Sequence, residues 1–305
     1  MKLIELVDIH LDKYQHSPYT YQSYRAVVKR FVKETGIENI EDLSEVSDIT
    51  ITKLKQWRLC VLERASGSTW NNYKRHLKAL LNTAVSHDLI SVNPIVKLHS
   101  SKEVQKEKTI AIEDLVTVIK KISAGSVIQP PMFWVHLIRF FYYTGMRRRQ
   151  LVGLKWADLD LENMKIWVDD SYNKTNQQGW IPLMPELLQS IFWLYEYIPG
   201  EPQGQVFNIT KIRGSYKADQ LEPDHITQGF RKISKRTGIR IGAHRLRHTM
   251  ATMIANKTSR DGEATVKIKH LQNLLFHSSI KTTVGYIHPS TDSQREMLDQ
   301  SLDRI

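Results

Sequence analysis

Apolar residues recur at steps of three and four over the first hundred positions, which is the spacing of one face of an α-helix. Tyr21 and Phe31 lie in one such stripe, and Trp70 opens another. Ser68 or Thr69 is expected to cap the second of these helices. The polar sides of the two predicted helices carry five cations, namely Arg25, Lys29, Lys74, Arg75 and Lys78.

These helices are predicted to form a helical domain over residues 1–98. Pro94 ends its last helix, because proline cannot continue the hydrogen-bonding pattern. Residues 99–109 are polar, charged and without periodicity, which indicates a linker. We expect a second domain over residues 110–288 and a short tail over residues 289–305.

The second part of the chain mixes helices with a pair of strands. Residues 133–143 are dense in bulky apolar side chains, as is typical of a buried helix, and Gly145 is expected to end it. Residues 164–169 and 180–183 read as strands on either side of turn residues, which predicts a hairpin with Lys174 in its turn. Later helices are predicted over residues 224–237, 244–256 and 263–276. The fold class is therefore mainly α with a small antiparallel sheet.

Composition and charge narrow the functional classes. The chain has 305 residues, of which 41% are hydrophobic and 25% charged, which fits two folded domains and excludes a disordered or collagen-like polymer. Cys60 is the single cysteine, so an intramolecular disulfide and a zinc site of several thiolates are both excluded. The formal net charge is +11, and most of this excess lies between residues 106 and 288. Such a charge favours a polyanionic partner.

The protein is expected to be soluble and cytoplasmic. Glu5 and Asp8 interrupt the segment that would have to be the apolar part of a signal peptide. The sequence contains no uninterrupted run of ~18 apolar residues, so we expect no membrane span and no membrane partner.

Four local clusters carry side chains suited to chemistry. They are Thr144-Gly145-Met146-Arg147, the turn residue Lys174, His244-Arg245-Leu246-Arg247-His248, and Leu274-Leu275-Phe276-His277 followed by Tyr286. His244 and Arg247 are three residues apart, so on a helix both point the same way. Such a pair turned inward needs an anion, and no acid is spaced to supply one. A phosphate from outside the protein would satisfy the pair.

His244 and His248 also have the spacing of a zinc-binding helix. A hydrolytic zinc helix carries glutamate after its first histidine, whereas Arg245 stands there, and two guanidinium groups would repel a dication. The sequence contains neither the G-x-x-x-x-G-K-[ST] phosphate loop nor the G-x-S-x-G motif of serine hydrolases. We therefore predict no metal, no nucleotide and no other cofactor.

In their order along the chain, the four clusters resemble the tyrosine recombinase family, also called the phage integrase family. T-G-M-R, with Leu154 to Asp158 downstream, is similar to the family's first arginine motif. H-R-L-R-H-T resembles the second motif, H-x-L-R-H-T, and L-L-F-H-S-S-I-K-T-T-V-G-Y-I-H resembles the segment with the last histidine and the nucleophilic tyrosine. Residues 18–98 are similar to the family's helical core-binding domain.

The resemblance implies a site-specific DNA recombinase with a SAM-like core-binding domain followed by a catalytic domain. Tyr286 would attack a DNA phosphate and form a covalent 3′-phosphotyrosine intermediate, without metal or ATP. A phenol with a pKa of ~10 is a poor nucleophile unless positive charge stabilises its phenolate. Arg147 and Arg247 would supply that charge while binding the non-bridging phosphate oxygens, for which the guanidinium fork is suited.

The leaving group of this reaction is a 5′ hydroxyl, which needs a proton donor. Lys174 is the candidate general acid. His244 is expected to accept the phenol proton or to hold a phosphate oxygen, and His277 to donate to the same oxygen. The sequence leaves the division of labour between the two histidines open.

The resemblance also implies a partner and an assembly. The partner is double-stranded DNA with inverted-repeat core sites, bound by two protomers per site and by four in the synapse, with an accessory directionality factor as a further candidate. Arg148 and Arg149 are expected to contact the DNA backbone, as are the five cations of the first domain. The tail over residues 289–305 is expected to dock on the next subunit. Integration, excision, inversion and resolution all remain open, and a mobile genetic element is the expected setting.

Three departures from the family pattern leave alternatives open. Gln150 stands where the family usually has glutamate, which keeps a hydrogen-bond acceptor but loses its charge, and Phe276 stands where glycine is common. Residues 256–269 form a longer stretch than usual, which is expected to be a basic surface loop near DNA or a neighbouring subunit. One alternative is a type IB topoisomerase, which relaxes supercoils with the same kind of tyrosine. The other is a non-catalytic DNA-binding protein of the same fold.

Overall fold

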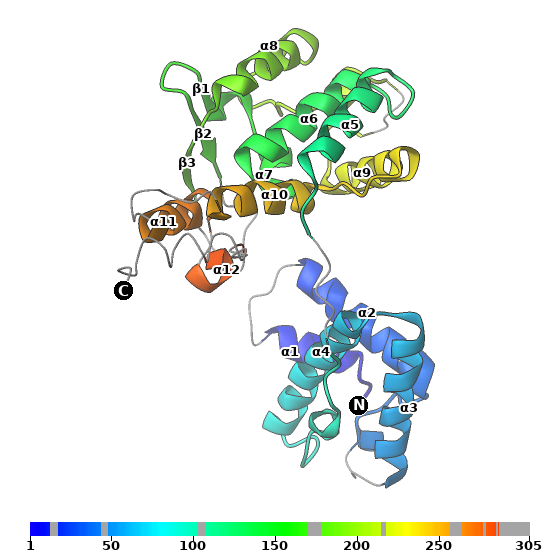
Figure 1. Ribbon diagram of the computed structural model, residues 1–305. Coiled ribbons are helices and arrows are strands. Elements are labelled where there is room, and N and C mark those ends of the chain that lie inside the picture. The colour runs from blue at the N-terminus through cyan, green and yellow to red at the C-terminus, as the bar shows by residue number, and fades with distance from the viewer. Residues whose placement is uncertain are drawn as a thin grey trace, which may run out of the picture. The chain divides into compact units, whose positions relative to one another are not determined.

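The computed structural model describes residues 1–12, 18–43, 48–102, 108–169, 178–214, 218–256, 264–276, 279–284 and 286. The chain divides into two compact units, Met1–Lys106 and Glu107–Ile305, and each has its own hydrophobic core. Both units are mostly helical, and the second also contains a small sheet, so the predicted fold class is confirmed (Figure 1). Within the described residues, every helix is too short or too polar to cross a membrane.

In its described part, the first unit contains α1 (Glu5–Asp12), α2 (Pro18–Thr35), α3 (Asp48–Arg64) and α4 (Gly67–Ser86), with short 3-10 turns at Glu41–Leu43 and Pro94–Lys97. The predicted apolar stripes face its core. The rings of Phe31, Trp57 and Trp70 are buried and meet edge to face, with centroids 4.9 and 5.1 Å apart. The N-cap of α4 differs from the prediction, because Ser66 accepts a hydrogen bond from the backbone N–H of Thr69 at 3.3 Å.

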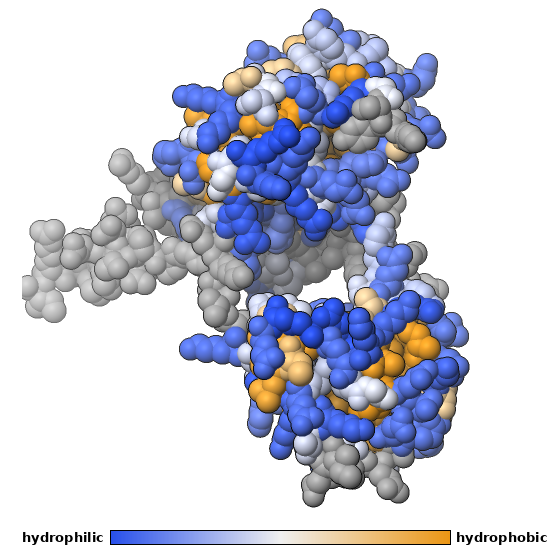
Figure 2. All heavy atoms as spheres, turned by 90° about the vertical axis from the view of Figure 1, so that its right-hand side faces the viewer, coloured by the Kyte–Doolittle hydropathy of each residue, from blue (hydrophilic) through white to orange (hydrophobic). Residues whose placement is uncertain are grey.

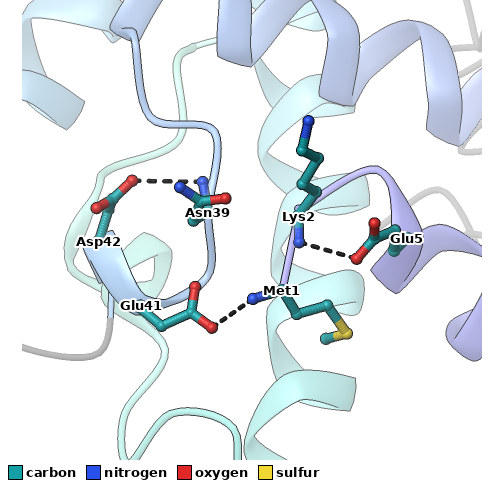
Figure 3. Close-up of polar contacts among 6 residues, drawn as sticks. All are labelled: Met1, Lys2, Glu5, Asn39, Glu41 and Asp42. Atoms are coloured by element: carbon teal, nitrogen blue, oxygen red, sulfur yellow. Dashed lines mark hydrogen bonds and ion pairs between the residues drawn. The ribbon is translucent and has the colours of Figure 1, made fainter.

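Polar contacts fix the residues before α1 to the segment between α2 and α3 (Figure 3). The amino group of Met1 pairs with Glu41, and Lys2 and Asn39 form an antiparallel bridge. The backbone N–H of Asn39 donates to the Asp42 carboxylate at 3.3 Å. The short helix α1 is thereby held against the rest of the unit.

Residues 99–102, predicted as the start of the linker, pack on the first unit. The carbonyl of His99 accepts a hydrogen bond from the Trp70 indole at 3.0 Å. Asn71 donates to the carbonyl of Ser101 at 2.9 Å and accepts from its N–H at 2.8 Å. The packing of the first unit therefore continues beyond the predicted domain end.

The second unit is built around α6 (Pro131–Thr144), which is buried along almost its whole length. Its other described helices are α5 (Ile112–Ser123), α7 (Arg148–Gly153), α8 (Leu188–Tyr197), α9 (Pro223–Thr237), α10 (Ala243–Asn256), α11 (Ala264–Leu274) and α12 (Ile280–Val284). Gly229 of α9 lies directly against Trp134 of α6, and a Cβ at Gly229 would come within 1.8 Å of the indole ring. Glycine is therefore what lets these two helices approach.

A three-stranded antiparallel sheet with the order β1-β2-β3 completes the second unit. The predicted hairpin is confirmed as β2 (Lys165–Val168) paired with β3 (Gly179–Pro182), with Trp167 opposite Trp180. β1 (Leu159–Asp160) was not predicted, because two residues are too few to show an alternating pattern. Lys174 lies outside the described residues.

The predicted helices near residues 224 and 244 are confirmed as α9 and α10, and the third is confirmed as α11. The expectation of a surface loop over residues 256–269 is wrong for residues 264–269, which belong to α11. The apolar spacing of Ile268, Leu271 and Leu275 continues into this stretch, and the last two are buried, so the helix gains a packed face. Residues 257–263 and the tail over 289–305 lie outside the described residues.

Candidate active site

The connection between α6 and α7 presents Arg147. Gly145 ends α6 with a φ of 62°, a left-handed conformation that favours glycine. A Cβ at Gly145 would also come within 2.0 Å of the Met250 side chain, so α10 approaches the turn closely. Met146 turns into the core, and Arg147 then caps the start of α7.

Gln150 holds the backbone of this turn. Its Oε1 accepts a hydrogen bond from the backbone N–H of Arg147 at 2.7 Å, and the side chain is buried. Its Nε2 has no hydrogen-bond partner among the described residues. The acceptor that the sequence retains at this position therefore supports the backbone of Arg147.

Arg247 projects from α10 and is 3% exposed. Its Nη1 donates to the carbonyl of Gly145 at 2.5 Å, and its Nη2 donates to the carbonyl of Leu275 at 2.6 Å. Burial and, to a smaller extent, the charge of Arg147 lower the pKa of Arg247 to about 10, although the charge of Tyr286 and a hydrogen bond with its side chain oppose the shift. Arg247 therefore remains a cation at neutral pH, although it lies in the interior.

The residues that follow α11 fix both arginines. The carbonyl of Leu275 accepts from Arg247, and the next carbonyl, that of Phe276, accepts from Nη2 of Arg147 at 3.2 Å. Phe276 has a φ of 50°, which is unusual for a residue other than glycine. Its ring lines an apolar groove of about 610 Å³ together with Trp180, Leu271 and other residues. The segment of Leu275 and Phe276 thus binds both arginines through its backbone carbonyls, while the side chain of Phe276 lines the apolar groove.

Tyr286 is hydrogen-bonded to the side chain of Arg247. It is 4% exposed and packs in a small apolar cluster with Met250, Leu271 and Leu275. Its backbone N–H donates to the carbonyl of Thr283 at 3.0 Å, which places Tyr286 just after α12. The phenol is therefore held beside the buried guanidinium.

Two histidines of α10 lie beside the arginines and Tyr286. Nε2 of His244 lies 2.9 Å from Nε2 of His248, and the ring centroid of His248 lies 4.8 Å from that of Tyr286. Enclosure by the surrounding walls lowers the pKa of His244, and the charges of Arg247, Lys108 and Arg147 lower it further. His244 therefore favours the neutral form, which can accept a proton.

The two arginines, the two histidines and Tyr286 line one cleft of about 1050 Å³ in the second unit. The structure brings together four of the predicted catalytic residues there, namely Arg147, His244, Arg247 and Tyr286. The other basic residues and histidine of its described lining are Lys108, Arg148, Arg231, Arg240, His248 and Lys281. No aspartate or glutamate belongs to that described lining, so the cleft is suited to an anion. Lys174 and His277 lie outside the described residues.

Arg148 and Arg149, the two arginines after Arg147 that are predicted to contact DNA, differ in their positions relative to the cleft. Arg148 lines the cleft, but its guanidinium donates to the Thr227 hydroxyl and lies 3.9 Å from the Asp224 carboxylate. Arg149 is not part of the cleft lining. Arg231 also lines the cleft, and sequence reasoning missed it. It lies four residues after Thr227, so both residues lie on the face of α9 that borders the cleft.

The first unit carries a separate cationic surface. Burial lowers the pKa of Lys74, and the charges of Lys78 of α4 and Arg58 of α3 lower it further, so both of these cations lie near Lys74. We call the three side chains the α3–α4 patch. Arg25 contacts the Tyr21 ring at 5.2 Å, and Lys29 lines a groove of about 400 Å³ beside α2. Figure 2 shows hydrophilic side chains over most of the face of each unit that it presents.

Comparison with protein families settles the relationship. The model of the phage integrase family matches residues 111–293, and the model of the phage integrase SAM-like domain matches residues 2–101. The chain belongs to the phage integrase family. This is the tyrosine recombinase family that the sequence resembles.

Several curated proteins are similar to the chain. A Pseudomonas syringae protein, named provisionally as a tyrosine recombinase XerC, is 31% identical over 98% of this chain and 64% of its own length. A Pseudomonas aeruginosa protein with the same provisional name is 29% identical over 90% of this chain and 66% of its own length. The tyrosine recombinase XerC of Bacillus pumilus is 23% identical over 92% of this chain and 89% of its own length. The chain thus spans about two thirds of the length of the two Pseudomonas relatives.

Solved structures share the fold. The Tn1549 transposon integrase, in complex with circular intermediate DNA, has a TM-score of 0.73 at 21% identity and covers 98% of this chain and 99% of its own. The lambda integrase bound to DNA has a TM-score of 0.68 at 15% identity and covers 100% of this chain and 99% of its own. Because these identities are low, the similarity shows that the folds of the two units are shared, and it shows nothing further.

Proposed function

We propose that the protein is a site-specific DNA recombinase that cuts and rejoins strands through a covalent 3′-phosphotyrosine at Tyr286. The observation that carries this proposal is the position of the Tyr286 phenol beside the buried Arg247, in a cleft whose described lining is rich in cations and free of carboxylates. A DNA phosphate supplies the anion that such a cleft requires. Membership of the phage integrase family supports the same reading.

In the proposed reaction, Arg147 and Arg247 together stabilise the negative charge on the phosphate. Both guanidinium groups are held in place by backbone carbonyls, so they need little reorganisation when a phosphate enters. As Tyr286 attacks phosphorus, negative charge grows on the non-bridging oxygens, and the planar guanidinium groups stabilise that charge most strongly in the transition state.

Proton transfers accompany the attack. The bond from the Tyr286 oxygen to phosphorus forms while the bond from phosphorus to the 5′ oxygen breaks. We propose that neutral His244 accepts the phenol proton and that Lys174 donates a proton to the departing 5′ hydroxyl. His277 holds a phosphate oxygen in this proposal. Attack by a 5′ hydroxyl from another strand reverses these steps, so rejoining needs neither metal nor ATP.

The proposed partner is double-stranded DNA, bound by more than one protomer. The Tn1549 integrase and the lambda integrase were solved with DNA, and a lambda integrase dimer was solved on a COC′ core site. We propose two protomers on each inverted-repeat site and four in the synapse. We also propose that the tail over residues 289–305 docks on a neighbouring subunit, with the apolar groove beside Phe276 as its receiving surface.

Covalent trapping tests this function directly. Nicked duplexes with a randomised core lose a short fragment after cleavage, so a covalent adduct cannot reverse and accumulates on a denaturing gel. The wild-type protein is expected to form the adduct, and sequencing of the attached strands will give the target site. Tyr286→Phe should abolish it, while Tyr195→Phe, on the exposed surface of α8, should retain it.

Each contrary result points to a different function. DNA binding without any adduct would favour a non-catalytic DNA-binding protein. Adducts accompanied by relaxation of supercoiled plasmids that lack the selected site would favour a topoisomerase. An adduct that persists in Tyr286→Phe would overturn the assignment of the nucleophile.

A further inference from the structure

His248 makes two contacts that the family motif does not explain. It lies one helical turn after His244 on α10, and the two Nε2 atoms are 2.9 Å apart. The other contact is with Tyr286, whose ring is inclined by 60° to the His248 ring at a centroid separation of 4.8 Å. His248 therefore touches both residues between which the proposed reaction moves a proton.

A contact between two imidazole nitrogens constrains their protonation. One nitrogen must donate its N–H and the other must accept it, so the bridge holds a single proton. The direction of the bridge is tied to the tautomer of His244, because a donating Nε2 leaves Nδ1 without a proton and an accepting Nε2 places the proton on Nδ1. A His248 side chain without Nε2 would leave that tautomer unspecified.

The surroundings disfavour a protonated His244. The cations that lower the pKa of His244 come from three segments: Arg247 from α10, Arg147 from the turn before α7, and Lys108 from the residues before α5. Tyr286 faces the pair from the segment after α12, and Lys281 of α12 lines the same cleft. The described lining contributes no carboxylate that would offset these charges.

We propose that His248 is a positioning residue for strand cleavage, which orients His244 through its Nε2 and supports the Tyr286 ring with its own ring. This inference rests on the proposed function of Tyr286 and His244. It assigns to His248 neither a covalent bond nor a direct contact with DNA. The residue acts by holding the base and the nucleophile in fixed orientations.

Two substitutions separate the contacts. His248→Phe keeps a ring beside Tyr286 and removes Nε2, whereas His248→Gln keeps a polar side chain and removes the ring. His87→Phe, at an exposed position at the end of α4, is the matched control. DNA affinity and circular dichroism show whether each variant is folded, and either His248 variant can carry the test if the other fails to fold.

Single-turnover cleavage of the trapped DNA substrate is the first measurement. His248→Phe is expected to lower the cleavage rate constant about tenfold, the effect of one lost hydrogen bond in the transition state, with DNA affinity unchanged. His248→Gln should recover part of the rate, and His87→Phe should match the wild type.

Nitrogen-15 NMR of labelled histidines is the second measurement, and it does not depend on activity. The ring nitrogen shifts of His244 are expected to report one dominant tautomer in the wild type and a mixture in His248→Phe. Unchanged His244 shifts together with wild-type kinetics in His248→Phe would overturn the inference. A wild-type protein that forms no adduct would instead overturn the proposed function, while the NMR result would still decide whether His248 orients His244.

Discussion

The two units hold positive charge in opposite ways. In the first unit, the cations of the α3–α4 patch lie at or near the surface of helices, where water solvates them and salt screens them. In the second unit, Arg247 is buried, and backbone carbonyls fix its guanidinium before any ligand arrives. Solvated surface cations attract a polyanion without fixing its position, whereas a guanidinium held in place is suited to binding a single phosphate in one orientation. The comparison predicts that rate and affinity can be separated by mutation.

The largest expected effect comes from the buried cation. Arg247→Lys keeps a charge but cannot donate to the carbonyls of Gly145 and Leu275 while also binding a phosphate with a fork. We expect the cleavage rate constant to fall by roughly 10² to 10³, as for loss of a preorganised transition-state donor. Single-turnover trapping measures this change. Arg245→Lys, on the same helix but outside the cleft lining, should stay within about twofold of the wild type. Equal losses in both variants would contradict the special role of the buried cation.

A smaller effect is expected in the pH dependence of cleavage. Only neutral His244 can accept the phenol proton, and its pKa lies below the ordinary 6.5. The rate at subsaturating DNA should therefore keep its plateau as the pH falls below 6.5, and should drop only through the lowered pKa. Lys108→Ala removes one of the charges that lower this pKa, so it should move the acid limb upward. An acid limb at or above pH 6.5 in the wild type would contradict this assignment.

The smallest expected effect concerns the α3–α4 patch. Lys78→Gln should weaken DNA binding by a few-fold at most and should lower the slope of log affinity against log salt by about 0.9, because one phosphate contact is lost. The cleavage rate at saturating DNA should not change. Fluorescence anisotropy over a salt series gives the slope, with Lys53→Gln on α3 as the control. A lower saturated rate in Lys78→Gln would mean that the two cationic regions do not act separately.

The sequence predicted those elements that are marked by a long apolar pattern, by a glycine at a helix end or by a recognisable motif. The dense apolar run before Gly145 gave α6, and the glycine itself ended the helix with the expected left-handed backbone. The motif order placed Arg147, Arg247 and Tyr286 in one site, although they are distant along the chain. That prediction depended on the family resemblance, because the spacing of single residues does not specify such long-range contacts.

Other features could not be predicted, for physical reasons. β1 and α12 are too short to show periodicity, and Ser66 precedes two other candidate caps that are equally suitable by residue type. The contact between His248 and Tyr286 joins α10 to a segment almost forty residues later, and no local pattern encodes it. Lys174 and His277 lie outside the described residues, so their roles stay predictions.

The consecutive carbonyls of Leu275 and Phe276 have a mechanical consequence. The ring of Phe276 forms part of the wall of the apolar groove, while its carbonyl receives a hydrogen bond from Arg147. A molecule that displaced this ring on entering the groove would also shift the attached peptide and weaken the hydrogen bond between the Phe276 carbonyl and Arg147. Affinity at the groove and readiness of that arginine would then be thermodynamically linked, each altering the other by the same factor.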